Sequence, residues 1–107
     1  MYEILFYKNA KGTEIITEWL LALRDDKAVH RITAHLAKVR AGNLGDVKPV
    51  GSGVWEIRID VGQGYRVYYS IVGKQVILLL AGGDKRSQSR DIEKAINYLD
   101  DYKRKNL

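Results

Sequence analysis

Two segments of the sequence, 54–61 and 65–72, alternate apolar residues with charged or aromatic ones. An alternation with a period of two is typical of β-strands, in which successive side chains point to opposite faces of the sheet. The short connection at 62–64 contains two glycines, which favours pairing of the two segments as a hairpin. We therefore expect one face of this hairpin to gather four functional side chains: Glu56, Arg58, Arg66 and Tyr68.

This set of groups has the chemistry that RNA cleavage without a metal ion needs. A carboxylate such as that of Glu56 can take the proton of a 2′-hydroxyl, while cations offset the charge that grows on the phosphorus. The planar guanidinium groups of Arg58 and Arg66 can each donate two hydrogen bonds to phosphate oxygens. The ring of Tyr68 can stack on a base. The same residues could instead form a solvated cross-strand charge network, and the pattern leaves that alternative open.

Three further cations flank these segments. Lys48 precedes the first segment, and Lys85 and Arg86 follow a third predicted strand at 75–81. Strand ends and loops can bring such side chains to the rim of a sheet face. We therefore expect them to add positive charge beside the arginines, where a phosphate would bind.

The pattern of histidines and cysteines does not predict a metal site. The chain contains no cysteine, which removes thiolate ligands and disulfides. His30 and His35 are five residues apart in a predicted helix, so they do not share a face as an i, i+4 pair of ligands would. The glycines at 62–64 lack the strand, loop and helix of a phosphate-binding loop. We predict catalysis with no metal and no cofactor.

The first half of the sequence predicts a strand and a helical hairpin. Residues 2–7 are rich in aromatic and branched side chains and are followed by a turn. From Thr13 to Gly42, apolar residues recur every three or four positions, the pattern of helices that bury one side. Asp25 interrupts the pattern and can cap a second helix. We therefore expect two helices joined by a short connection.

The second half predicts a meander and a last helix. Residues 42–53 contain the only proline and several glycines, so they are predicted to form a loop. The three strands named above follow, and an amphipathic helix begins near Ser87 or Ser89. The whole order predicts a single α+β domain over 1–107. Its antiparallel sheet would have the N-terminal strand plus the three-strand meander, with the helices gathered on one face and the other face open.

Length, charge and hydropathy limit the number of domains, the kind of partner and the location of the protein. A chain of 107 residues with 46% hydrophobic and 29% charged residues is typical of one globular domain. Its net charge of +5 suits a polyanion or an acidic protein as a partner. No apolar run is long enough to span a bilayer, and the first residues lack the pattern of a signal peptide. A cytoplasmic protein with no membrane partner is therefore expected.

Two stretches resemble a known family closely. They are VKPVGSGVWEIRIDVGQGYRVYY at 47–69 and ILLLAGGDKRSQ at 77–88, the second followed by the amphipathic helix. They resemble the RelE/ParE toxin superfamily, in its branch of Gp49-like or HigB-like addiction-module killer proteins. The resemblance covers essentially the whole chain, and its most specific parts are the WEIRI and GYRVYY sequences.

The resemblance implies a toxin of a type II toxin–antitoxin system that cleaves mRNA on the ribosome. It also implies a cognate antitoxin, often one with a helix-turn-helix domain. By position, Arg58 and Arg66 match arginines that the family associates with phosphate and transition-state charge. Lys48 and Lys85 match basic residues near the same site.

The resemblance leaves the proton-transferring groups and part of the function open. Some members take the catalytic carboxylate from the preceding loop, which makes Asp46 the competitor of Glu56, and Arg86 and Tyr68 are expected to contact RNA. No histidine follows the last strand, so the general acid is not identified. ParE-type relatives poison DNA gyrase without cutting RNA, and a non-catalytic nucleic-acid-binding module would keep the cations but would not need Glu56.

Overall fold

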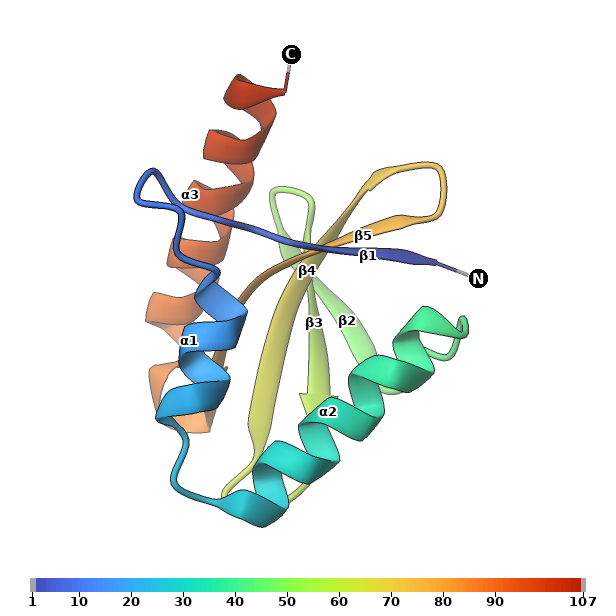
Figure 1. The fold of residues 1–107 in the computed structure, drawn as a ribbon, viewed down its shortest axis with the longest axis vertical. Helices are drawn as coiled ribbons and strands as arrows, with labels where there is room; N and C mark the ends of the chain where they lie inside the picture. The colour runs from blue at the N-terminus through green and yellow to red at the C-terminus, as the bar shows by residue number, and fades with distance from the viewer. Residues whose placement is uncertain (1, 107) are drawn as a thin grey trace.

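The chain folds into a five-stranded sheet with helices on both of its faces (Figure 1). The structure is a computed structural model that describes residues 2–106. Its elements in chain order are β1 (Glu3–Phe6), α1 (Ile15–Ala22), α2 (Asp26–Arg40), β2 (Val47–Gly51), β3 (Val54–Ile59), β4 (Tyr65–Gly73), β5 (Val76–Asp84), a short 3-10 helix (Lys85–Ser87) and α3 (Gln88–Lys105). The predicted α+β class is confirmed, and so are the helical hairpin and the meander β3–β4–β5.

The sheet differs from the prediction in two of its strands. Its order is β1-β5-β4-β3-β2, and β1 runs parallel to β5, so the sheet is mixed and not wholly antiparallel. The segment predicted as a loop contains β2, which pairs antiparallel with β3. Pro49 is tolerated there because β2 is an edge strand, and the register shifts between Pro49 and Gly51. The glycine and proline content of this segment therefore led to the prediction of a loop where the structure has a short edge strand.

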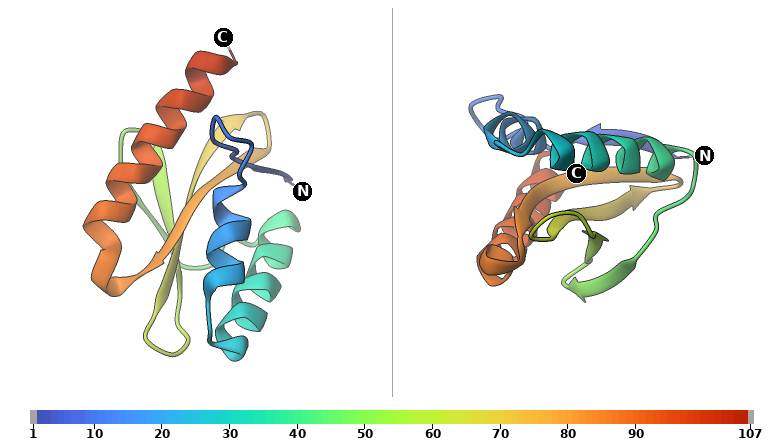
Figure 2. Two further views of the ribbon diagram at one scale, coloured as in Figure 1. Left: turned by 60° about the vertical axis from the view of Figure 1, so that its left-hand side comes forward. Right: turned by 90° about the horizontal axis from the view of Figure 1, so that it is seen from below.

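The helices lie on opposite faces of the sheet, which corrects the prediction that they gather on one. The left view of Figure 2 shows α3 on one side of the strands and α1 with α2 on the other. The hairpin covers the face of Ile57 and Val67, whereas Ala95 and Leu99 of α3 pack against the face of Tyr68. The apolar stripe of α3 must be buried, and the hairpin already occupies the first face. Most of the face predicted to be open is therefore covered.

Two glycines in β5 allow helices to approach the sheet closely. A Cβ at Gly82 would overlap the indole ring of Trp19 on α1, and a Cβ at Gly83 would overlap the carboxylate of Asp91 on α3. The indole ring packs against the core, and the Asp91 carboxylate is mostly buried and accepts a hydrogen bond from the Ser87 hydroxyl, so neither neighbour can move aside freely. The Gly82–Gly83 pair thus lets one strand carry close contacts on both of its faces.

We expect Gly82→Ala to lower the free energy of unfolding by about 1–3 kcal/mol, the usual cost of overpacking a filled core. Gly73→Ala is the matched control in a neighbouring strand, since its Cβ would meet Val76 at an ordinary 3.6 Å. Urea denaturation of the two variants and the wild type measures the difference. Equal denaturation midpoints for all three proteins would show that α1 does not pack against Gly82 as described.

Within residues 2–106, no helix has both the length and the apolar character needed to cross a membrane.

Candidate active site

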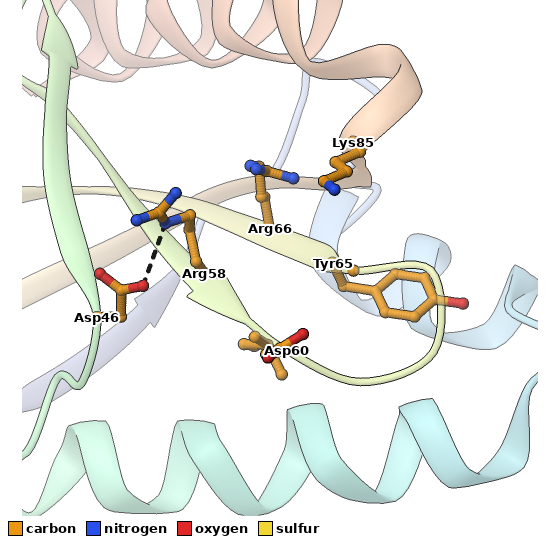
Figure 3. Close-up of a pocket in the computed structure, with 8 residues that line it drawn as sticks. Asp46, Arg58, Asp60, Tyr65, Arg66 and Lys85 are labelled. Atoms are coloured by element: carbon orange, nitrogen blue, oxygen red, sulfur yellow. Dashed lines mark hydrogen bonds and ion pairs between the residues drawn. The ribbon is translucent and has the colours of Figure 1, made fainter.

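A pocket of about 220 Å³ opens beside the end of β3 and the start of β4, near the turn that joins them (Figure 3). Different elements supply its charged groups. The two arginines come from β3 and β4, a lysine comes from the 3-10 helix, and a carboxylate comes from the chain just before β2. The lining residues are Asp46, Arg58, Ile59, Asp60, Gly64, Tyr65, Arg66 and Lys85. Three of the five residues predicted to be catalytic therefore lie in one pocket, together with Asp46.

Arg58 and Arg66 occupy directly opposite positions on β3 and β4. The prediction that they share a face of the sheet is confirmed. Like charges at opposite positions destabilise a sheet unless carboxylates compensate them. Each arginine has such a partner: Arg58 Nε lies 3.2 Å from Asp46 Oδ2, and Arg66 Nε lies 3.4 Å from Glu56 Oε1.

The first of these ion pairs is open to solvent. The side chains of Arg58 and Asp46 are 46% and 63% exposed, and an exposed pair contributes only about 0.2–1 kcal/mol to stability. The backbone N–H of Arg58 also donates to the Asp46 carbonyl at 2.9 Å, which fixes Asp46 beside β3. A bound phosphate can therefore draw Arg58 away at little cost, leaving the Asp46 carboxylate free beside it.

The second ion pair is buried, which corrects the expectation for Glu56. The Glu56 side chain is 0% exposed, lies beneath α3 and accepts a hydrogen bond from Gln88 Nε2 at 2.7 Å. Lys48 Nζ approaches Glu56 Oε1 from outside at 4.0 Å, and Lys48 does not line the pocket. Strand alternation identified the face that carries Glu56 but not the helix that covers it. A carboxylate in this position cannot contact a bound RNA.

Tyr68 is buried on the same covered face, opposite Glu56. Burial raises the pKa of its hydroxyl, and the negative charge of Glu56 raises it further. The expectation that its ring stacks on a base is therefore wrong for the fold as it stands. The aromatic residue that lines the pocket is Tyr65, but its ring points away from the arginines and packs edge-on against Trp19 (Figure 3).

Lys85 and Arg86 follow β5 in a 3-10 turn that Asp84 caps. The Asp84 carboxylate accepts hydrogen bonds from the backbone N–H groups of Arg86 and Ser87, at 2.8 and 3.3 Å. Burial opposes ionisation of Asp84, but the hydrogen bonds from Arg86 and Ser87 outweigh it and lower the pKa. The turn directs Lys85 toward the pocket (Figure 3). The Arg86 guanidinium instead lies 3.2 Å from Asp84 on the open surface.

Sequence reasoning did not select two residues that belong to this region. Asp60 lines the pocket, and its alternation with Arg58 along the strand was a usable signal. Gln88 holds Glu56 from α3, and nothing in the type or spacing of a glutamine at a helix start indicates such a contact. Within residues 2–106, no group of three or more His, Cys, Asp or Glu side chains is arranged to hold a metal ion.

The pocket thus brings together two guanidinium groups, an ammonium group and accessible carboxylates. Such a set can bind a phosphate, stabilise negative charge that develops on it, and move protons at its edge. The buried Glu56 supports this set from beneath and does not belong to the accessible surface.

Comparison with known proteins places most of the chain in one family. The model of the family described as phage derived protein Gp49-like matches residues 18–100, a range that includes every residue lining the pocket. A Haemophilus influenzae protein, itself described only as uncharacterized, is 42% identical over 85 residues, which are 79% of this chain and 86% of that protein. The chain therefore belongs to the Gp49-like family, which is part of the RelE/HigB-like family of toxins of toxin–antitoxin modules.

Proposed function

We propose that this protein is the toxin of a type II toxin–antitoxin module and that it cleaves mRNA on the ribosome without a catalytic metal ion. The observation that carries the proposal is the pocket itself. Arg58 and Arg66 face each other across two strands with Lys85 beside them and the carboxylate of Asp46 accessible next to Arg58. A site that merely bound a phosphate would need the cations but not the carboxylate.

The proposed reaction is an intramolecular transfer at one phosphate of the RNA. Asp46 takes the proton of the 2′-hydroxyl, whose oxygen attacks the adjacent phosphorus. The bond from phosphorus to the 5′-oxygen of the next nucleotide breaks, which leaves a 2′,3′-cyclic phosphate and a 5′-hydroxyl. Arg58 and Arg66 stabilise the charge on the phosphate oxygens in the transition state. Lys85 donates a proton to the leaving oxygen or stabilises its charge.

The other predicted site residues take supporting roles in this proposal. Glu56 is buried and cannot reach a bound 2′-hydroxyl, so it does not serve as the general base. Lys48 adds positive charge near the site and, being half-exposed, can reach RNA that extends past β2. Arg86 is largely exposed on the surface beside Lys85 and can contact a neighbouring phosphate. No role on the RNA is retained for Tyr68.

Membership of a toxin–antitoxin family implies a cognate antitoxin as partner. We propose that it binds through an acidic segment, since the toxin has a net charge of +5 and presents cations at its pocket. An antitoxin that carries a helix-turn-helix domain would fit the family. A small gene beside the toxin gene that encodes an acidic protein is the candidate antitoxin gene. Co-purification of its product should be strong with the wild-type toxin and weaker with Arg58→Ala, and equal recovery with both would exclude this arginine from neutralisation.

The test of the proposed function is induction of the toxin in growing cells, with Arg58→Ala as the paired variant. The exposed Asp46–Arg58 pair adds little stability, so this variant should fold normally and lose most of its toxicity. We expect new transcript 5′ ends within coding regions for the wild type and few for the variant, mapped by primer extension. Growth arrest with DNA breaks and intact transcripts would instead assign the protein to the gyrase poisons.

A further inference from the structure

The Glu56 carboxylate sits in the interior between the sheet and α3, and each of its oxygens contacts a different part of the site. Oε1 faces Arg66 Nε at 3.4 Å, and Oε2 accepts a hydrogen bond from Gln88 at 2.7 Å. The side chain has no exposed surface. A buried ionised carboxylate is costly unless it is paired and hydrogen-bonded. Oε1 and Arg66 Nε form an ion pair without hydrogen-bond geometry, since neither atom has a hydrogen-bond partner within residues 2–106. The charge of Glu56 therefore acts on Arg66, and its one hydrogen bond holds Gln88.

The contact through Oε1 sets the direction of Arg66. Only 10% of the Arg66 side chain is exposed, so solvent screens the pair weakly. Glu56 approaches Nε, at the inner edge of the guanidinium group. The contact with Glu56 is made by Nε, and within residues 2–106 no side-chain hydrogen bond is donated by either Nη of Arg66. The outer part of the group therefore remains available to donate to a phosphate in the pocket.

The contact through Oε2 reaches the cation on the other side of the pocket. Gln88 is the first residue of α3 and follows the 3-10 helix Lys85–Ser87 without a break. Holding Gln88 to the sheet fixes where this turn ends. Asp84 fixes the start of the same turn through its two backbone hydrogen bonds. The position of Lys85 thus depends on the carboxylate that also orients Arg66.

We propose that Glu56 is a positioning residue that couples the two sides of the pocket, through Arg66 on one side and through Gln88 and the Lys85 turn on the other. This inference rests on the proposed function for its catalytic consequence, though the coupling itself is a property of the fold. It gives the buried carboxylate a function that does not require contact with RNA. It also explains why a charge is kept beneath α3, where an apolar residue would otherwise pack.

Two variants separate the two contacts. Glu56→Gln keeps the size of the side chain and an acceptor for Gln88 but removes the charge that faces Arg66. Gln88→Leu keeps that charge but removes the hydrogen bond to α3. Glu93→Gln, on the exposed side of α3, is the control for loss of one negative charge. Each protein is examined by NMR of the Arg66 Nε–H group, by amide exchange at 85–90 and by single-turnover cleavage of ribosome-bound mRNA.

We expect Glu56→Gln to shift the Arg66 Nε–H resonance and to lower the cleavage rate at saturating substrate by about tenfold or more, with a smaller change in KM. The same substitution made together with Arg66→Lys should cost little further rate, because residues that act as a unit are not additive. Gln88→Leu should accelerate amide exchange at 85–90 and leave the Arg66 resonance in place. Glu93→Gln should match the wild type in every measurement.

Full additivity of Glu56→Gln and Arg66→Lys would overturn the coupling to Arg66. Unchanged amide exchange in Gln88→Leu would overturn the coupling to the Lys85 turn, and this result does not depend on whether Glu56→Gln folds. If the resonance and exchange changes occur as expected but the wild type does not cut RNA, the positioning role stands and the proposed function fails. Wild-type behaviour of both variants in all three measurements overturns the inference alone.

Discussion

Replacing Arg66 with alanine is expected to slow RNA cleavage by about 10²–10³-fold, the usual cost of losing one group that stabilises charge in the transition state. Arg66 lines the pocket and pairs with a buried carboxylate, which limits the positions that its guanidinium group can take. Single-turnover cleavage of ribosome-bound mRNA measures the effect. The loss should appear mainly in the rate at saturating substrate, because the interaction strengthens as charge develops on the phosphate.

The same substitution should also destabilise the protein, which requires a second variant as control. Arg66→Ala leaves the buried Glu56 without its closest cation, with Lys48 at 4.0 Å and the Gln88 hydrogen bond still in place. Breaking a buried ion pair costs about 3–5 kcal/mol. Arg66→Lys keeps a cation beside Glu56 but loses the planar fork that donates two hydrogen bonds. We expect it to fold more stably than Arg66→Ala in urea and still to cleave slowly. Rapid cleavage by a folded Arg66→Ala protein would remove Arg66 from the mechanism.

Asp46→Asn should lower the cleavage rate by about 10²–10⁴-fold, the range expected when a general base is removed. Asp46 is accessible, lines the pocket and lies beside Arg58. The change to asparagine keeps the shape of the side chain and removes its ability to accept a proton. Because the Asp46–Arg58 pair is exposed, the free energy of unfolding should change by less than about 1 kcal/mol.

Asp60→Asn is the matched control for this prediction. Asp60 lines the same pocket and carries the same charge, but within residues 2–106 it forms no ion pair with either arginine. We expect it to reduce the rate far less than Asp46→Asn does, in the same assay. If Asp60→Asn were the more damaging substitution, Asp60 would be the base and Asp46 a partner that only orients Arg58.

The sequence predicted the arginine pair correctly because strand alternation fixes which residues share a face. Arg58 and Arg66 are separated by a glycine-rich hairpin, and pairing across that hairpin leaves them opposite each other. Their placement needed only local geometry. Lys85 also lies at the pocket, as expected, because it comes directly after the last residue of β5 in the sequence.

The accessibility of the remaining site residues depended on which face α3 covers. The apolar stripe of α3 could be read from its sequence, but the face on which it packs depends on how much of the sheet the hairpin already covers. Glu56 and Tyr68 therefore had their face predicted correctly and their exposure predicted wrongly. The parallel pairing of β1 with β5 is likewise a long-range choice that residue types do not record.

The chemical nature of the cut ends tests the central claim most directly. Purified toxin is mixed with ribosome-bound mRNA, and the downstream fragment is examined for its 5′ group. Attack by the 2′-hydroxyl predicts a 5′-hydroxyl there and a 2′,3′-cyclic phosphate on the upstream fragment, and a 2′-deoxy substitution at the cleaved nucleotide should abolish the cut. A 5′-phosphate, or undiminished cleavage of the 2′-deoxy substrate, would contradict the mechanism in which Asp46 activates the RNA's own hydroxyl.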